Sequence, residues 1–214
     1  MQKVAYKITF LFLLLGTTAA IDLVSVSAQM KPRKPAMISR RDWNARKPVG
    51  EGKKHAIRYI TIHHTATKQR PDVPVATKMR NLQAFSQRDD KLDTGKFKPR
   101  WFDIPYHFYI AVDGRIAEGR KLKYVGDTNT EYDPAGHALL VLEGSFNKEH
   151  PSQAQIDSMK KLVAWLVRKY KVPAANIKGH DDYARTGCPG ENLKKLLPEM
   201  RHLNERNKLS LVHD

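Results

Sequence analysis

Hydrophobic positions along the chain alternate between the two-residue period of strands and the longer period of helices. Residues 59–64 read Tyr-Ile-Thr-Ile-His-His, which predicts a short buried strand that ends at two histidines. The segment 138–142 is continuously apolar, as is typical of a strand buried on both faces. Strands are predicted over 59–64, 106–112, 115–118, 138–142 and 177–180, with a turn at Asp113-Gly114 between the second and the third.

Apolar residues at helical spacing predict three helices. The first covers residues 72–88, and its apolar stripe consists of Val75, Met79, Leu82 and Phe85. The clearest helix follows a capping box that starts at Ser152, and it extends to Tyr170. The last begins near Glu191 and is interrupted around Pro198. The charged segment 89–100 between the first helix and the second strand predicts an exposed loop.

Strands and helices alternate without internal repeats, which predicts a single α/β domain. We expect a central, mostly β-sheet layer of about five to six strands flanked by about three helices. This domain covers residues 37–203. It follows a Pro- and Lys-rich linker, 29–36, and precedes a C-terminal tail, 204–214.

In the first 28 residues, basic residues, an apolar run and small residues follow one another in the order that is typical of a secretory signal peptide. Lys3 and Lys7 precede an apolar run over 8–15, and small residues surround the expected cleavage site at Ala28, with Ala20 as the alternative. A membrane anchor is the competing interpretation, but the apolar run is too short to span a bilayer. We therefore expect export to the periplasm or the medium, with no stable membrane insertion after cleavage.

Charge points to an anionic partner. The 214 residues include 38 Lys and Arg against 22 Asp and Glu, a formal net charge of +16. Export and the absence of an aromatic-basic motif argue against nucleic acid and favour the anionic cell envelope. The single cysteine, Cys188, excludes an intramolecular disulfide and any cluster of several cysteines.

Four residues of metal-binding type lie at or after the ends of predicted strands. His63 and His64 end one strand, His180 follows another, and Cys188 comes eight residues later. Two imidazoles and a thiolate form a known catalytic zinc set, which leaves one tetrahedral position open. Taken one at a time, a surface or core histidine is the better interpretation at each position, and only the residues taken together make a metal site an equal alternative.

Five segments in order resemble the superfamily of peptidoglycan recognition proteins and type 2 zinc N-acetylmuramoyl-L-alanine amidases. They are Ile38 to Arg46, Ile62-His63-His64-Thr65-Ala66, Asp103 to Phe108, Asp113 to Arg120, and Gly179-His180 to Cys188-Pro189-Gly190. The resemblance implies a zinc hydrolase that cuts the amide bond between N-acetylmuramic acid and L-alanine. The implied partners are peptidoglycan or muropeptides, and we expect a monomer.

The resemblance assigns the metal to His63, His180 and Cys188, with His64 as the alternative ligand. It gives catalytic roles to Tyr106 and Thr186. The expected substrate-facing residues are His64, Thr65, Arg120 and His137.

The chain departs from parts of the family pattern. Val141 occupies the position where some cytoplasmic relatives carry a catalytic glutamate, and Glu143 is a weaker substitute. Asp127-Thr128 stands where many members carry a histidine, a place that His137 could take. A non-catalytic peptidoglycan-binding module of the same fold is the alternative function, and retention of the cysteine ligand favours the enzyme.

Overall fold

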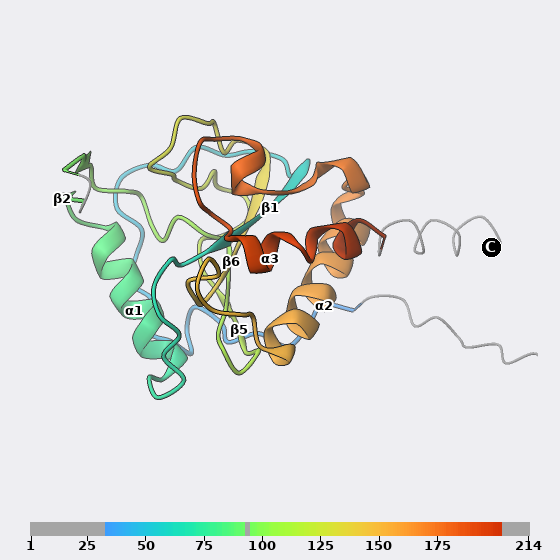
Figure 1. The fold of residues 1–214 in the computed structure, drawn as a ribbon. Coiled ribbons are helices and arrows are strands. Elements are labelled where there is room, and N and C mark those ends of the chain that lie inside the picture. Colours follow the sequence, from blue (N-terminus) through green and yellow to red (C-terminus); the bar gives the residue numbers. More distant parts are fainter. Residues whose placement is uncertain (1–32, 93–94, 203–214) are drawn as a thin grey trace, which may run out of the picture. The chain divides into compact units, whose positions relative to one another are not determined.

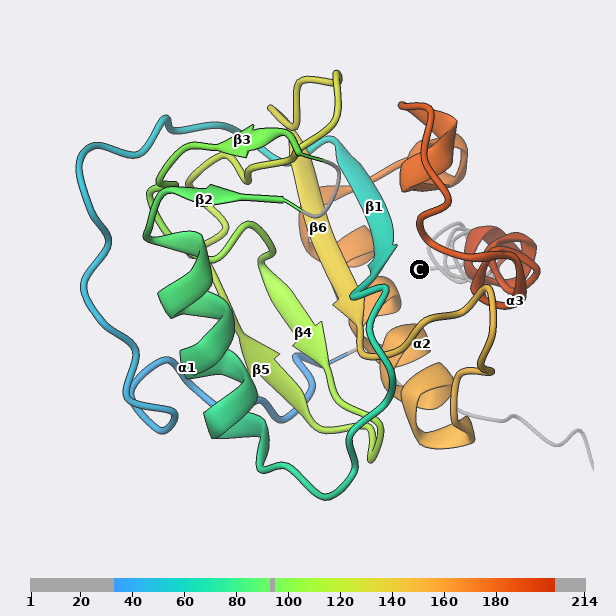
Figure 2. The same ribbon diagram turned by 60° about the vertical axis from the view of Figure 1, so that its left-hand side comes forward.

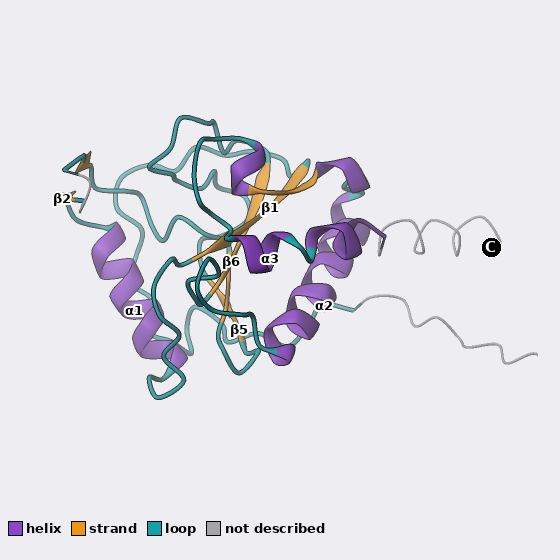
Figure 3. Cartoon of the chain, in the orientation of Figure 1, coloured by secondary structure: helices purple, strands orange, loops and turns teal. Residues whose placement is uncertain are grey.

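A five-stranded sheet lies at the centre of the fold, in the order β5-β4-β6-β1-β7 (Figure 1, Figure 3). Its strands are β1 (Tyr59–His64), β4 (Phe108–Ile110), β5 (Ile116–Glu118), β6 (His137–Leu142) and β7 (Ile177–Gly179). Strand β6 pairs in parallel with β1 and β4, β7 pairs in parallel with β1, and β5 is the antiparallel return of a hairpin with β4. The structure is a computed structural model that describes residues 33–92 and 95–202.

Helices cover both faces of the sheet (Figure 2). Helix α1 (Val75–Ser86) lies on one face, and α2 (Gln153–Tyr170) lies on the other. The capping box at the start of α2 is present, with the Ser152 hydroxyl accepting from the backbone N–H of Gln155. Helix α3 (Glu191–Lys194) ends before a second helical segment that begins at Leu197, and short 3-10 turns occur at Ala174–Asn176 and His180–Asp182. The predicted α/β architecture is confirmed.

Strand alternation divides the core into two clusters. Ile60 and Ile62 of β1 pack toward α2, together with Leu140 of β6 and Leu162 of the helix. On the opposite face, Val141 belongs to the cluster that includes Val75 and Met79 of α1. Because side chains alternate along β1, this arrangement leaves Thr61 and His63 on the α1 face.

The stripe predicted for α1 is only partly correct. Val75 and Met79 are buried as expected, but the stripe continues through Gln83 and Ser86. The Gln83 amide nitrogen donates to a carboxylate oxygen of Asp103 at 2.8 Å, so a buried polar residue is satisfied there. Leu82 and Phe85 instead line a pocket beside the helix.

The prediction of an exposed loop over 89–100 is only partly correct, because most of its described residues are exposed but four of them form strands and one is buried. This segment holds a small antiparallel pair, β2 (Asp90–Lys91) and β3 (Phe97–Lys98). Lys98 is fully buried, where its ammonium donates to three backbone carbonyl oxygens and lies near the rings of Phe85 and Trp101. Charge along the sequence does not reveal such a site because the partners of the lysine are backbone oxygens and aromatic faces.

Smaller differences concern the ends of elements. Strand β4 is shorter than the predicted 106–112, and Tyr106 and His107 precede it.

Within the described residues, no helix is long and apolar enough to cross a membrane. The predicted signal peptide, 1–28, and tail, 204–214, lie outside the described residues, as does the first part of the linker.

Candidate functional site

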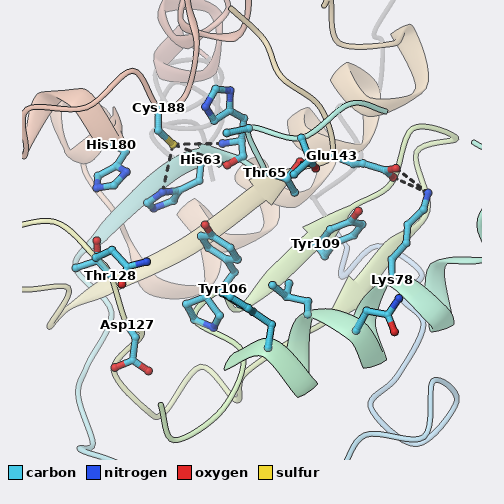
Figure 4. Close-up of a pocket in the computed structure, with 18 of the residues that line it drawn as sticks. His63, Thr65, Lys78, Tyr106, Tyr109, Asp127, Thr128, Glu143, His180 and Cys188 are labelled. Atoms are coloured by element: carbon cyan, nitrogen blue, oxygen red, sulfur yellow. Dashed lines mark hydrogen bonds and ion pairs between the residues drawn. The ribbon is translucent and has the colours of Figure 1, made fainter. Parts of the chain in front are cut away.

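A pocket of about 1000 Å³ lies between α1 and the carboxyl ends of the central strands (Figure 4). His63, Tyr106, His180, Thr186 and Cys188 line it together. In an open sheet, this edge is where the loops after parallel strands converge and where ligands commonly bind.

Parallel pairing brings the two histidines of the candidate metal site together. Ile62 of β1 pairs with Gly179 of β7. His63 follows Ile62 and His180 follows Gly179, so the two histidines are neighbours. Their ring centroids lie 4.5 Å apart. Cys188 approaches from the loop after His180, and one potential ligand atom from each of the three residues lies within 4.8 Å of the others.

These three residues fit a zinc ion. Two ligands bound at about 2.3 Å (sulfur) and about 2.0 Å (nitrogen) in tetrahedral geometry lie about 3.5 Å apart. The Cys188 sulfur and His63 Nδ1 lie 3.6 Å apart. Among the described residues, the sulfur is the one hydrogen-bonding partner of the His63 ring, whose buried Nε2 has none. Protein groups therefore do not compete with a metal for this imidazole.

Burial controls the ionisation of the three groups. It holds the pKa of His63 well below its ordinary value and lowers that of His180 to about 4, so both imidazoles are neutral at neutral pH. Neutral imidazole is the form that binds metal. Burial also raises the pKa of the Cys188 thiol to about 12, so a metal must displace the thiol proton when it binds.

His64 occupies the opposite side of β1. Its Nδ1 accepts from the backbone N–H of Phe146 at 3.2 Å, and its ring lies 6.2 Å from the Phe146 ring. Its backbone N–H donates to the Cys188 sulfur at 3.4 Å. His64 therefore contributes to the site through its backbone, and His63 is the histidine whose side chain lies with His180 and Cys188.

Two hydroxyl groups lie in the same pocket. The Tyr106 ring is 5.2 Å from that of His63, and its hydroxyl points toward the candidate metal ligands (Figure 4). Burial and the nearby Cys188 raise the pKa of Tyr106 above its ordinary value, so the phenol keeps its proton. Thr186 Oγ1 accepts from the backbone N–H of Cys188 at 3.2 Å, which leaves its own proton available to donate.

Thr65 also lines the pocket, but its hydroxyl is held by the protein. It accepts from the Gly144 N–H at 3.0 Å and from Thr67 Oγ1 at 3.0 Å. These bonds tie the end of β1 to the end of β6 across the pocket wall.

The structure does not bring Arg120 into the pocket. The guanidinium is buried and donates to the carbonyl oxygens of Asp103, Ile104 and Val125, and it pairs with Asp127. With its donors used in this way, Arg120 anchors the loop that follows Val125 and is not placed to bind substrate.

His137 is also absent from the residues that line the pocket. It starts β6, its Nδ1 lies 2.7 Å from Thr61 Oγ1, and it stacks on Tyr59 at 4.6 Å. Burial lowers its pKa to about 4, as expected for a neutral core histidine. His137 therefore does not take the place of the missing family histidine.

A buried ion pair lies at the other end of the pocket (Figure 4). Glu143 is 2 % exposed, and its two oxygens lie 2.7 and 2.8 Å from the Lys78 ammonium. One oxygen also accepts from the Arg70 N–H at 2.9 Å. Both of its oxygens are already engaged by protein donors, which argues against Glu143 as a substitute for the missing glutamate. Helical spacing on α1 could have indicated Lys78 as pocket-facing, but not its partner.

Sequence reasoning also missed Thr130. Its Oγ1 lies 2.8 Å from Nε2 of His180, and both residues line the pocket. The only signal was the polar run Asp127 to Thr130 after Val125-Gly126, at the place where a histidine was expected.

Comparison with known proteins identifies the family to which this chain is similar. The family described as N-acetylmuramoyl-L-alanine amidase matches residues 53–191, a range that contains His63, His180 and Cys188. The peptidoglycan-recognition protein LB of Drosophila melanogaster is 33% identical over 184 residues, which are 81% of this chain and 74% of the relative.

Two further likenesses extend the comparison. An N-acetylmuramoyl-L-alanine amidase of Sus scrofa is 31% identical over 170 residues, which are 76% of this chain but 27% of that longer relative. The solved structure of a Tyr-to-Phe mutant of Drosophila PGRP-LB in complex with tracheal cytotoxin has a TM-score of 0.61 and 31% identity, and the match covers 74% of this chain and 90% of that one.

Proposed function

Because the chain belongs to the superfamily of N-acetylmuramoyl-L-alanine amidases and peptidoglycan-recognition proteins, we propose that it is a zinc-dependent amidase of peptidoglycan. Its reaction is hydrolysis of the amide bond between N-acetylmuramic acid and the L-alanine of the stem peptide. The observation that carries this proposal is the gathering of His63, His180 and Cys188 at one side of a pocket that also holds Tyr106 and Thr186.

His63, His180 and Cys188 would hold a Zn²⁺ ion, which would supply a Lewis acid for the amide carbonyl and lower the pKa of a water molecule. The chain's own residues bind and orient the substrate. Tyr106 keeps its proton, so it acts as a hydrogen-bond donor to the carbonyl oxygen as negative charge develops there. Thr186 is a second donor, positioned by the bond from the Cys188 N–H to its oxygen.

Export and the charge of the chain suit this substrate. Residues 1–28 have the signal-peptide pattern, and the net charge of +16 attracts the protein to the anionic cell envelope. Solved relatives in complex with tracheal cytotoxin support binding of muropeptides. We propose that the mature protein acts as a monomer in the periplasm or the medium.

The alternative is a peptidoglycan-binding module without catalysis. Curated relatives include recognition proteins as well as an amidase, so the family alone does not separate the two functions. The candidate metal ligands support the enzyme, because a binder has no need of a half-buried thiol beside two neutral imidazoles. The retained Cys188 therefore favours the enzyme.

The test is digestion of intact sacculi by the purified mature protein. We expect about one zinc ion per chain and release of free stem peptides with new alanine amino termini, measured by mass spectrometry. Chelation should abolish release, and added zinc should restore it. Release of glycan fragments alone, or no release by a protein that still sediments with sacculi, would refute the amidase.

A Cys188→Ser variant provides the matched control. It should lose zinc and hydrolysis but still sediment with sacculi, because serine is a poor zinc ligand of similar size. Unchanged hydrolysis by this variant would refute the assignment of Cys188 to the metal.

A further inference from the structure

His180 has a hydrogen-bonding partner outside the candidate metal ligands. Its Nε2 lies 2.8 Å from Oγ1 of Thr130, a residue fifty positions earlier in the chain. Metal-binding histidines generally use their second ring nitrogen in such a bond, which fixes both the tautomer and the orientation of the ring.

Neighbouring bonds are compatible with His180 as the donor in this contact. The Thr130 backbone N–H donates to Thr128 Oγ1 at 3.1 Å, and the two threonine hydroxyl oxygens lie 2.7 Å apart. When Thr130 donates its proton to Thr128, its oxygen is left to accept from His180. His180 then carries its proton on Nε2 and presents Nδ1 as the ligand atom.

The loop that carries Thr130 is fixed at its beginning. The buried Arg120 guanidinium binds the Val125 carbonyl oxygen and the Asp127 carboxylate, directly before Thr128. Further along the loop, the Tyr132 ring lies 5.2 Å from the His180 ring. His180 is therefore held by a hydrogen bond and by an aromatic contact from one loop.

These contacts lead us to infer that Thr130 is a positioning residue for the metal site, which sets the tautomer and ring orientation of His180 through its hydroxyl group. Thr130 does not have to touch the metal or the substrate to act in this way. The inference rests on the proposed zinc site, but the state of the His180 ring can be measured without zinc.

Thr130→Val tests the hydroxyl because it keeps the shape of the side chain and removes the acceptor. We expect zinc affinity, measured by competition with a chromophoric chelator, to fall about 10- to 100-fold. Thr130→Ser should restore affinity to nearly that of the wild type, because serine keeps the oxygen. Affinity unchanged in Thr130→Val, or reduced equally in both variants, would overturn the inference.

Thr61→Val is a matched control on a second threonine–histidine pair. Thr61 Oγ1 lies 2.7 Å from Nδ1 of His137, which is outside the pocket, so this variant should bind zinc like the wild type. An equal loss of affinity in Thr61→Val would overturn a specific role for Thr130.

Nitrogen-15 NMR of the histidines separates this inference from the proposed function. In metal-free wild-type protein at neutral pH, we expect His180 to carry its proton on Nε2, and Thr130→Val should produce a mixture of tautomers. If the wild type binds no zinc, the proposed amidase fails, while this measurement still decides the role of Thr130. A proton on Nδ1 in the wild type would overturn the inference.

Discussion

Resistance of one core histidine to protonation should make the protein less stable in acid. His107 is 1 % exposed, and its neutral ring is fully hydrogen-bonded. Nδ1 accepts from the Leu139 N–H at 2.9 Å, and Nε2 donates to the Tyr124 carbonyl oxygen at 2.9 Å. A second proton would have to enter on Nδ1, where it would face another donor. Burial accordingly lowers the pKa of His107 from 6.5 to about 3.

Proton linkage determines whether the free energy of unfolding rises or falls with pH. Below pH 6.5 the unfolded chain gains a proton at this histidine and the folded protein does not, so the free energy of unfolding falls as the pH falls. At pH 5 this single group removes about 2 kcal/mol of stability, and by pH 3 the loss reaches about 4 kcal/mol. Above pH 6.5 the stability from this group is fully present.

Urea unfolding of wild type and His107→Gln at pH 8 and pH 5 tests this reasoning. Glutamine cannot take up a proton, so its deficit relative to wild type should shrink by about 2 kcal/mol between the two pH values. His150→Gln, at an exposed histidine, controls for the loss of a histidine as such. A His107→Gln deficit that is the same at both pH values would refute the linkage.

Three further predictions concern the pocket and the core. Lys78→Met should lower the free energy of unfolding by about 3–5 kcal/mol because it leaves the buried Glu143 carboxylate unpaired, and adding Glu143→Gln should recover part of the loss in urea unfolding. Leu162→Ala, at a fully buried position under the sheet, should cost about 2–5 kcal/mol in the same assay, and a loss below 1 kcal/mol would contradict its place in the core. Tyr106→Phe should slow release of stem peptides about 100- to 1000-fold while sedimentation with sacculi is unchanged, whereas an unchanged rate would exclude the phenol as a donor.

The regular spacing of hydrophobic residues along the sequence predicts most of the fold, because most of the core is apolar. The strands β1 and β6 and the helix α2 follow their patterns closely, since each buries an aliphatic face against another. Prediction fails where polar groups are buried. Gln83 lies in the buried stripe of α1 and Lys98 lies in a segment that looks exposed, because both are satisfied by partners that are distant or belong to the backbone.

In the candidate metal site, too, the sequence predicts some residues and fails to predict others. Sequence motifs name His63, His180 and Cys188, and the parallel register of β1 and β7 supplies the reason why two of them meet. Thr130 could not be found in this way. Its contact with His180 depends on the path of a loop without periodic pattern, and a threonine in such a loop carries no signal of its own.

Arg120 connects the residues that a sequence motif indicates with the loop residue Thr130, which no motif indicates. It stands in the segment Asp113 to Arg120, which resembles the amidase family, and the resemblance predicts that it faces the substrate. In the structure its guanidinium is used up by three carbonyl oxygens and Asp127, at the start of the loop that reaches His180 through Thr130. A motif residue can therefore support a candidate metal site without touching the metal or the substrate. The loop that supplies a hydrogen bond to the candidate metal ligand His180 must itself be held in place.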